Sequence, residues 1–286
     1  KYFIENIEFV SPSYPSIGIN YLNDFNIIRI TIGLFKYFNK INKNTSFKKP
    51  ILVVSYDTRH FSKHFCLLTA STWSKLGGKV FIFNGPRSTP QLSYTVRNIK
   101  ADFGVMITAS HNPYNWLGLK IKSFKGCSVD ESFTKEVEKR VLLGNLIERL
   151  EGEYEKVDIK KFHLDRIKSL FDIDYISKRL KKMKLRIFVD SMHGSAANCM
   201  AEIFASNDLE VISEIRKDAD PFFGGKPPEP LLNYADDLIQ TLIKNSTNEV
   251  KTLGIIFDGD GDRIAAIDEK GRYSSTQDLL PYFISY

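Results

Sequence analysis

The sequence predicts an α/β fold made of two consecutive three-layer α/β domains with mixed, mostly parallel sheets. Short apolar runs alternate with stretches of helical pattern along most of the chain, which is typical of parallel strands joined by helices. The length of 286 residues suits two domains of ordinary size, roughly 100–200 residues each. Residues 150–178 are polar and charged and separate two such series, so we expect a helical connection there. The domains are placed at residues 1–165 and 166–286.

The first series begins with an apolar run that is typical of a buried strand. Similar runs, each bounded by turn residues, are expected to form strands at 51–56, 79–83, 103–108 and 117–122. Helices are expected between and after these strands, at 61–76, 90–99 and 130–149. The Gly77-Gly78 pair ends the first of these helices, since glycine is the usual residue just after a helix.

The second series repeats the pattern after the polar connection. The basic run 178–184 is expected to be the solvated face of a helix. Strands are then expected at 185–190, near 209–215, at 253–257 and at 264–267, with helices near 194–205 and 231–244. Residues 268–271 have the composition of a hairpin turn.

Composition narrows the class of protein. Hydrophobic residues make up 43% of the chain and charged residues 26%, as in ordinary globular proteins, and the net charge of +6 favours anionic small molecules. No nucleic-acid motif is present, and no apolar run reaches the roughly 20 residues of a membrane span, so we expect neither nucleic acid nor membrane as a partner. Three distant cysteines and the lack of a signal-peptide pattern at the first residues favour a reducing, cytoplasmic setting.

Three carboxylates at alternate positions follow the expected strand 253–257. Glycines separate Asp258, Asp260 and Asp262 and permit backbone angles that turn the side chains to one side. Crowded carboxylates repel one another unless a cation neutralises them, and ligands that are all oxygen favour Mg²⁺, Mn²⁺ or Ca²⁺ over zinc. The run therefore predicts a divalent-cation site, with a solvated acidic turn as the alternative.

An EF-hand calcium loop also carries alternating aspartates, but the pattern differs here. That loop needs glycine at its sixth position, which is occupied by Arg263, and it joins two helices rather than two strands. We therefore expect a cation site of another kind.

A serine stands on a loop at the end of another expected strand, where ligands usually bind in α/β sheets. Ser110 is followed by His111, and serine needs activation or prior phosphorylation to act as a nucleophile. A Ser-His hydrolase is disfavoured, because adjacent side chains seldom point at each other and no Gly-x-Ser-x-Gly elbow is present. Lys120, ten residues on, is a candidate for phosphate contact or proton transfer. A structural turn and a surface lysine are the alternatives at these positions.

These two loops resemble motifs of the α-D-phosphohexomutases, a superfamily that includes phosphoglucomutases, phosphomannomutases and phosphoglucosamine mutases. The serine motif spans 108–113 with 118–120, and the acidic motif spans 258–263. Further matching segments share the family's loop patterns and lie at 55–59, 88–90, 190–194, 220–225 and 228–230. Thr108 before the Ala-Ser-His-Asn-Pro run is more similar to the glucose and mannose mutases than to the glucosamine type.

The resemblance implies a mutase that interconverts hexose 1-phosphate and hexose 6-phosphate, with glucose favoured over mannose. Ser110 would be the phosphoserine and, through a phosphoryl oxygen, would join the three aspartates in holding one Mg²⁺. Hexose 1,6-bisphosphate would be the intermediate and activator. His111 and Lys120 would be catalytic, with Lys120 moving a proton or contacting phosphate. Arg263 would support the acidic loop and contact the phosphoserine, and Arg59 would be a more distant phosphate- or substrate-binding residue.

Two departures from the family pattern leave alternatives open. Residues 10–16 replace a glycine-rich loop that carries an arginine, and Pro15 stands where the arginine is expected. The family has four domains, and the resemblance implies that this chain carries domains I and II while domains III and IV, with their sugar and phosphate contacts, are absent from it. The alternative is therefore a degenerate, non-catalytic homologue or sugar-phosphate binding module that retains the fold; a phosphatase that hydrolyses phospho-Ser110 is a third reading.

Overall fold

The structure is a computed structural model that describes residues 8–12, 22–42, 49–141, 152–157, 159–204 and 211–285. It divides into two compact units. The first comprises Lys1–Ala109 and Asn115–Ile159, and the second comprises Ser110–Tyr114 and Lys160–Tyr286. The short segment 110–114 thus groups with the second unit, although the chain on either side of it belongs to the first.

The first unit is built on a six-stranded mixed sheet with the order β1-β5-β4-β2-β3-β6. Its strands are β1 (Glu8–Pro12), β2 (Ile51–Tyr56), β3 (Lys79–Phe83), β4 (Phe103–Ile107), β5 (Trp116–Ser123) and β6 (Glu155–Val157). The pairs β4–β2, β2–β3 and β3–β6 are parallel. β5 runs antiparallel to both β4 and β1. The mixed, mostly parallel sheet expected from the sequence is confirmed.

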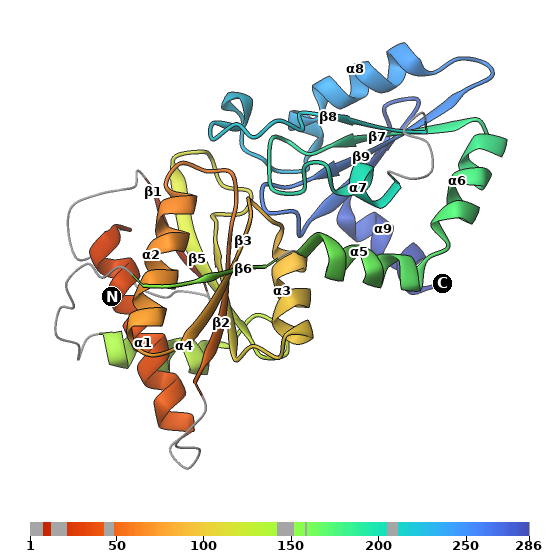
Figure 1. The fold of residues 1–286 in the computed structure, drawn as a ribbon. Coiled ribbons are helices and arrows are strands. Elements are labelled where there is room, and N and C mark those ends of the chain that lie inside the picture. The colour runs from red at the N-terminus through yellow and green to blue at the C-terminus, as the bar shows by residue number, and fades with distance from the viewer. Residues whose placement is uncertain are drawn as a thin grey trace. The chain divides into compact units, whose positions relative to one another are not determined.

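Helices cover both faces of this sheet because side chains alternate between the faces along each strand. The helices are α1 (Asp24–Ile41), α2 (Ser62–Lys75), α3 (Thr89–Asn98) and α4 (Glu131–Val141). Leu52 and Val54 of β2 belong to the core that includes α1 and α2, while Val53 between them packs with α3. Figure 1 shows α2 and α3 on opposite sides of the strands.

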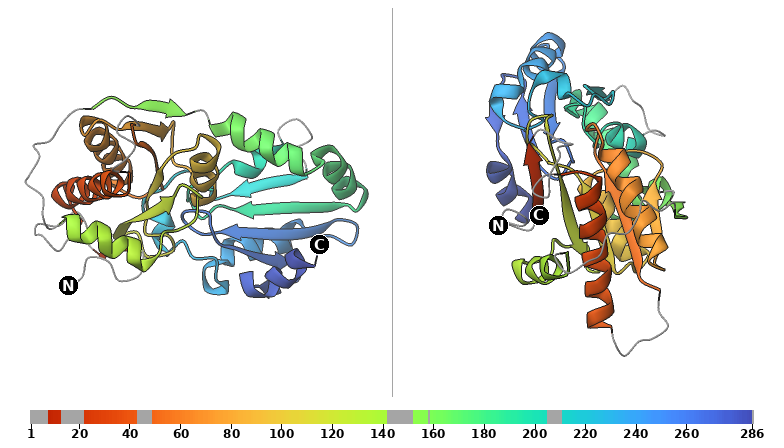
Figure 2. Two further views of the ribbon diagram at one scale, coloured as in Figure 1. Left: turned by 90° about the horizontal axis from the view of Figure 1, so that it is seen from below. Right: turned by 90° about the vertical axis from the view of Figure 1, so that its left-hand side faces the viewer.

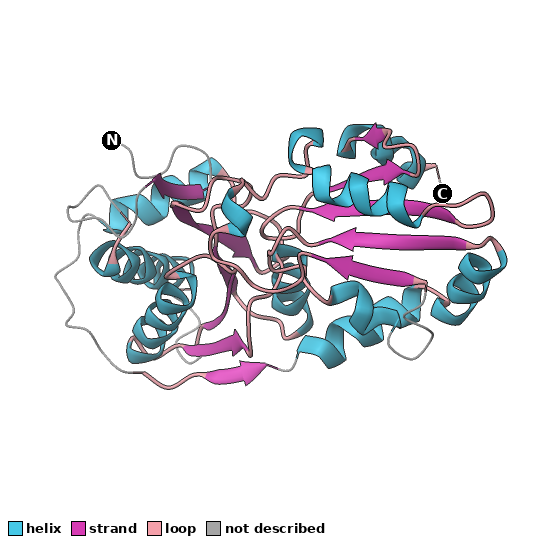
Figure 3. Ribbon diagram, turned by 90° about the horizontal axis from the view of Figure 1, so that it is seen from above, coloured by secondary structure: helices cyan, strands magenta, loops and turns pink. Residues whose placement is uncertain are grey.

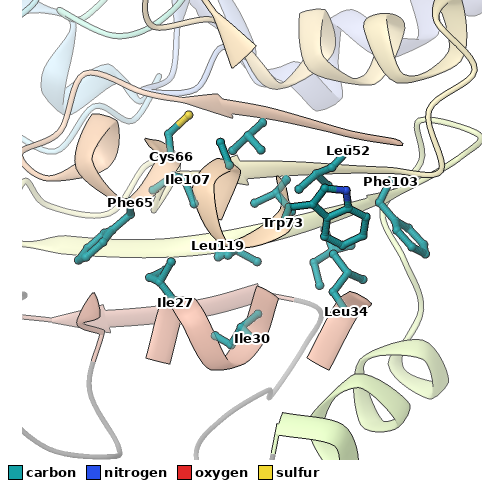
Figure 4. Close-up of a cluster of buried hydrophobic side chains, with 14 of the residues drawn as sticks. Ile27, Ile30, Leu34, Leu52, Phe65, Cys66, Trp73, Phe103, Ile107 and Leu119 are labelled. Atoms are coloured by element: carbon teal, nitrogen blue, oxygen red, sulfur yellow. The ribbon is translucent and has the colours of Figure 1, made fainter. Parts of the chain in front are cut away.

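The larger core of the first unit is centred on Trp73 of α2, whose side chain is completely buried. Its indole nitrogen donates a hydrogen bond to the Pro50 carbonyl at 3.2 Å, and its ring makes an edge contact with Phe35 at 5.1 Å between centroids. Ile27, Ile30 and Leu34 present one face of α1 to the same cluster (Figure 4). This packing fixes the strands whose ends carry the loops discussed below.

The second unit is built on a five-stranded sheet with the order β11-β10-β9-β7-β8 (Figure 3). Its strands are β7 (Leu185–Asp190), β8 (Ile212–Ile215), β9 (Lys251–Phe257), β10 (Ile264–Asp268) and β11 (Tyr273–Ser274). The helices are α5 (Ile159–Leu170), α6 (Ile173–Lys182), α7 (Cys199–Phe204), α8 (Asp236–Asn245) and α9 (Thr276–Ile284), with two 3-10 turns, η1 (Phe223–Gly225) and η2 (Leu232–Tyr234). β7 is parallel to β8 and β9, whereas β10 is antiparallel to β9 and β11.

The second sheet also lies between two layers of helices. Phe188 of β7 packs with Leu238 and Leu242 of α8 on one face. Its neighbour Val189 packs with residues of α6 and α7 on the other face. The left view of Figure 2 shows the green helices and the blue helices on opposite sides of these strands. The three-layer arrangement predicted for both halves of the chain is therefore present.

Several elements differ from the sequence-based expectation. α1 and β1 were not expected, and the connection 150–178, predicted to be helical, contains β6, whose backbone pairs with β3 before α5 and α6 begin. The helix expected near 194–205 is shorter, because residues such as Met192, His193 and Asn198 adopt left-handed backbone angles before α7 begins. The end of the helix expected at 130–149 lies outside the described residues beyond Val141.

None of the helices within the described parts of the chain combines the length and apolar character that a membrane crossing requires.

Candidate active site

The three aspartates lie on the turn that joins β9 to the antiparallel strand β10. Asp258 organises this turn, since its Oδ1 accepts backbone hydrogen bonds from Asp262 at 2.9 Å and from Arg263 at 3.1 Å. Its backbone carbonyl accepts a further bond from Gly261, which has a φ of +68° and so uses a conformation that favours glycine. The local hydrogen bonds explain why alternating Asp and Gly residues form a tight loop here.

The turn brings the three carboxylates together, as predicted. One oxygen from each of Asp258, Asp260 and Asp262 lies within 4.8 Å of the others. Asp258 and Asp260 are fully buried, whereas Asp262 is exposed. Such a grouping of hard oxygen donors suits a divalent cation of the Mg²⁺ or Ca²⁺ type.

Ser110 lies on the loop between β4 and β5 and reaches this cluster. Its Oγ donates a hydrogen bond to Oδ2 of Asp258 at 2.9 Å, and the side chain is buried. The serine has a φ of +52°, in the left-handed region that costs a non-glycine residue about 1–3 kcal/mol. Contacts around Ser110 must offset that strain, and strain of this kind is concentrated at functional sites.

Gly259 explains why the serine loop and the acidic loop can approach so closely. A Cβ atom at this position would lie 2.6 Å from the carbonyl oxygen of Ser110 and 2.9 Å from the Cγ of Pro228. Its own carbonyl accepts hydrogen bonds from the backbone and the hydroxyl of Ser195, at 3.0 and 3.1 Å. The glycine is therefore needed for the close approach of two backbones.

The electrostatics of the cluster also favour a cation. Burial raises the pKa of Asp258 well above its ordinary value, and the charges of Asp260 and Asp262 raise it further, while the Arg263 backbone amide opposes the shift. A bound divalent cation would stabilise the ionised carboxylates that burial and mutual repulsion disfavour. The three carboxylates and the Ser110 hydroxyl thus fit the cation predicted from the sequence.

Two further predicted residues flank the cluster and share one partner. The Nε2 of His111 lies 3.9 Å from Oε1 of Glu229, and Nη1 of Arg263 lies 3.9 Å from the same oxygen. Arg263 also supports the acidic loop through its backbone, whose carbonyl accepts from the Asp258 amide at 3.3 Å. Glu229 lies in the segment 228–230, which resembles a family motif, but the sequence assigns it no role. Nothing in the sequence indicates that its side chain lies near both His111 and Arg263.

Lys120 and Arg59 belong to the first unit. Lys120 is buried in β5, where its backbone stands opposite Met106 of β4. Arg59 is buried beyond the end of β2, and its Nε donates to Asp57 at 2.9 Å while its Nη1 donates to the Trp116 carbonyl at 3.1 Å. The structure therefore shows Arg59 in a buried ion pair, where its partners hold it in one orientation.

Asp57 is a residue that the sequence reasoning missed. Besides Arg59, it accepts hydrogen bonds from the hydroxyls of Ser62 at 2.6 Å and Thr108 at 2.7 Å. Burial raises the pKa of Asp57, and these three partners each lower it in part. Since Thr108 precedes Ser110 by two residues, Asp57 anchors the strand end from which the serine loop departs. The available signal was an acidic residue at a strand end, two positions before an arginine.

The altered segment 10–16 can be followed only in part. Its first residues lie in β1, where Val10 pairs with Gly118 of β5. Pro15, which replaces the expected arginine, lies outside the described residues.

Comparison with known proteins matches both units to one family. Residues 16–145 match the model described as phosphoglucomutase/phosphomannomutase, alpha/beta/alpha domain I, and residues 161–271 match domain II of the same family. A phosphoglucomutase of Staphylococcus haemolyticus is 28% identical over 88% of this chain and 46% of its own length. A phosphoglucosamine mutase of Campylobacter jejuni is 29% identical over 93% of this chain and 57% of its own length.

Solved structures show the same fold. A Thermus thermophilus protein assigned as a phosphomannomutase superposes with a TM-score of 0.85, at 24% identity, over 100% of this chain and 62% of that one. A Burkholderia thailandensis protein of the phosphoglucomutase/phosphomannomutase family has a TM-score of 0.71 at 21% identity, over 93% of this chain and 54% of that one. The chain spans about half the length of the curated relatives it matches, which include both glucose- and glucosamine-type mutases.

Proposed function

Because the chain belongs to the phosphoglucomutase/phosphomannomutase family, we propose that Ser110 carries the phosphoryl group in a hexose phosphate mutase reaction. The reaction interconverts hexose 1-phosphate and hexose 6-phosphate through a hexose 1,6-bisphosphate, with glucose as the first sugar to test and mannose as the second. One observation carries the proposal: the Ser110 hydroxyl lies 2.9 Å from the buried Asp258, within a group of three carboxylates. A serine placed beside a cation site is what a phosphoserine intermediate requires.

The proposed transfer exchanges one phosphorus–oxygen bond for another. The bond between phosphorus and the Ser110 Oγ breaks while a bond forms to the free hydroxyl of the hexose monophosphate, whose proton is removed. The bisphosphate then returns its other phosphoryl group to Ser110, and the sugar oxygen that is released takes up a proton. Lys120 is the proposed group for proton movement or phosphate contact, and His111 organises the serine loop.

Asp258, Asp260, Asp262 and a phosphoryl oxygen on Ser110 would hold one Mg²⁺. Bound there, the ion would neutralise charge that develops on the phosphoryl oxygens. Arg263 would add a positive charge beside the phosphoserine. Arg59, held by Asp57, would act at a distance as a positioning residue for phosphate or substrate.

Intact-mass analysis tests the phosphoserine directly. The purified chain is incubated with glucose 1,6-bisphosphate and Mg²⁺, and a single phosphoryl adduct is expected. Ser110→Ala should abolish the adduct, whereas Ser169→Ala, which alters an exposed serine whose hydroxyl donates to the nearby Arg166 carbonyl, should leave it unchanged. A folded chain that acquires no adduct under any condition would contradict the proposal and favour the non-catalytic homologue.

The sugar preference is tested by measuring how fast each hexose phosphate removes the phosphoryl group from the phosphorylated chain. Phosphorylated chain is mixed separately with glucose 1-phosphate, mannose 1-phosphate and glucosamine 1-phosphate, and loss of the adduct is followed with time. We expect glucose 1-phosphate to remove it fastest. Faster removal by glucosamine 1-phosphate would overturn the preference assigned from Thr108, and removal in buffer alone at the same rate would indicate a phosphatase.

A further inference from the structure

The segment Asp220–Pro230, which we call the clamp, contains only one short 3-10 turn, yet its conformation is tightly determined. Asp220 closes its first turn: Oδ1 accepts the Phe222 amide and Oδ2 accepts the Gly224 amide, each at 2.9 Å. Three consecutive residues, Phe223, Gly224 and Gly225, have φ values of 53°, 66° and 80°. Phe223 carries the usual penalty of a non-glycine residue in that region, and its side chain, 1% exposed, is locked in the interior.

The far end of the clamp is tied to the acidic loop and to the sheet. The Pro228 carbonyl accepts a hydrogen bond from the Gly259 amide at 3.1 Å, next to Asp258. The Pro230 carbonyl accepts one from the Tyr273 hydroxyl at 2.6 Å, in β11. Prolines 227, 228 and 230 fix their own φ angles, so this part of the clamp has little backbone freedom to lose.

Two side chains of the clamp contact the serine loop, residues 110–114. The ring of Phe222 meets the ring of Tyr114 edge to face, with centroids 5.2 Å apart. The carboxylate of Glu229 lies 3.9 Å from His111, and it lies at the same distance from Arg263 of the acidic loop. Both contacts join residues within the second unit, and both lie on the C-terminal side of Ser110, at residues 111 and 114.

We propose that the clamp positions the serine loop for phosphoryl transfer, with Phe222 and Glu229 as positioning residues. Glu229 sets the spacing between the serine loop and the acidic loop through His111 and Arg263, and Phe222 holds the other end of the loop through Tyr114. The strained φ of Ser110 makes such outside support necessary, because the loop does not favour that conformation by itself. The inference rests on the proposed function for its catalytic part, but its structural part stands on these contacts alone.

Amide hydrogen exchange tests the structural part without any reaction. Glu229→Gln removes the charge and keeps the shape, and Phe222→Leu removes the ring. We expect each to speed exchange of the amides of residues 110–112 and 114 by about threefold or more, since a loop with fewer tertiary contacts opens more often. Matched controls are Glu249→Gln, at a carboxylate 80% exposed and paired with Lys184, and Phe171→Leu, at a ring 55% exposed. Unchanged exchange in both clamp variants would overturn the proposal.

The rate of phosphoryl loading from glucose 1,6-bisphosphate tests the catalytic part. Misplacement of a reacting group by a fraction of an ångström is expected to slow loading about tenfold in each clamp variant, while the controls load at the parent rate. In the pair Glu229→Gln and Arg263→Gln, the double variant should lose less than the product of the single effects, because both remove the same link. Thermal unfolding of each variant excludes a loss of fold as the cause.

Two outcomes separate this inference from the proposed function. Faster exchange at 110–114 with unchanged loading would overturn the positioning role while leaving the phosphoserine in place. A parent chain that never loads would refute the phosphoserine, and the exchange measurement would then decide by itself whether the clamp holds the loop.

Discussion

Replacing Asp258 with asparagine should make the metal-free second unit more stable, although it removes a residue at the centre of the site. Asp258 is buried and surrounded by Asp260 and Asp262, whose ligand oxygens lie within 4.8 Å. Two unit charges at that separation repel by about 3.5 kcal/mol at an effective dielectric constant of about 20. An asparagine keeps the Oδ1 that accepts the amides of Asp262 and Arg263, so the turn itself retains its hydrogen bonds.

The expected gain is smaller than the full repulsion, because the Ser110 hydroxyl loses a charged acceptor. Hydrogen bonds to charged groups contribute about 1.5–3 kcal/mol, which leaves a net stabilisation of about 0.5–2 kcal/mol. For a unit of this size, that corresponds to a rise of about 1–8 °C in the unfolding temperature.

The assay is thermal unfolding of the parent chain and the Asp258→Asn variant in EDTA and in excess Mg²⁺. The parent should gain about 2.7 kcal/mol when Mg²⁺ is at about 100 times its dissociation constant, and the variant should gain far less. Asp165→Asn, at an exposed carboxylate of α5, is the matched control and should behave as the parent does. The reasoning fails if the variant is less stable than the parent in EDTA, or if Mg²⁺ stabilises both equally.

The raised pKa of Asp258 makes the stability of the metal-free second unit depend on pH. Its folded pKa is raised above the ordinary value of 3.8 by burial and then by Asp260 and Asp262, so the folded state holds its proton more tightly than the unfolded state. This contribution to stability is complete below the unfolded pKa and is lost as pH rises through the folded pKa. In EDTA, the parent should therefore lose stability as pH rises above 3.8 toward neutrality, and Asp258→Asn should lose less.

Three further substitutions test the scaffold that supports the site. Ser62→Ala removes a buried hydroxyl donor from Asp57 and should lower the free energy of unfolding of the first unit by about 1–3 kcal/mol in urea titrations, with no effect on the second unit. Gly104→Ala places a Cβ 2.6 Å from the Cγ2 of Val96 and should cost about 1–3 kcal/mol by overpacking; unchanged unfolding would show that α3 can shift freely. Arg216→Met leaves the fully buried Asp190 without its cation and should cost the second unit about 3–5 kcal/mol, whereas Arg216→Lys should recover part of this loss.

The strands were predictable because buried parallel strands require continuous apolar runs, and such runs at 51–56 and 79–83 match β2 and β3 in full. Helix α1 was not predictable, because it contains isoleucines, a threonine and Gly33, none of which favours a helix in isolation. Tertiary packing decides its conformation: a Cβ at Gly33 would lie 2.7 Å from Val141 of α4. β6 was missed since a strand of three residues carries no periodic pattern.

The candidate site also has one part that the sequence predicts and another that depends on the tertiary fold. The acidic run was predictable because all three carboxylates come from one turn, and local sequence determines how such a turn folds. The link through Glu229 was not, because it joins residues 111, 229 and 263, which only the tertiary fold brings together. Asp57 lay within a motif already noticed, but its hydrogen bonds to Ser62 and Thr108 depend on two segments that the motif does not include.

The grouping of residues 110–114 with the second unit has a consequence for dissecting this protein. A fragment that starts at Lys160 contains the acidic turn and the clamp but lacks the pentapeptide with Ser110, and a fragment that ends at Ile159 carries Ser110 away from its hydrogen-bond acceptor. No single cut between the units yields a piece with both Ser110 and the acidic turn. Chimaeras with a related mutase should therefore exchange residues 110–114 together with the second unit, and a graft that moves one without the other is expected to separate Ser110 from the three aspartates.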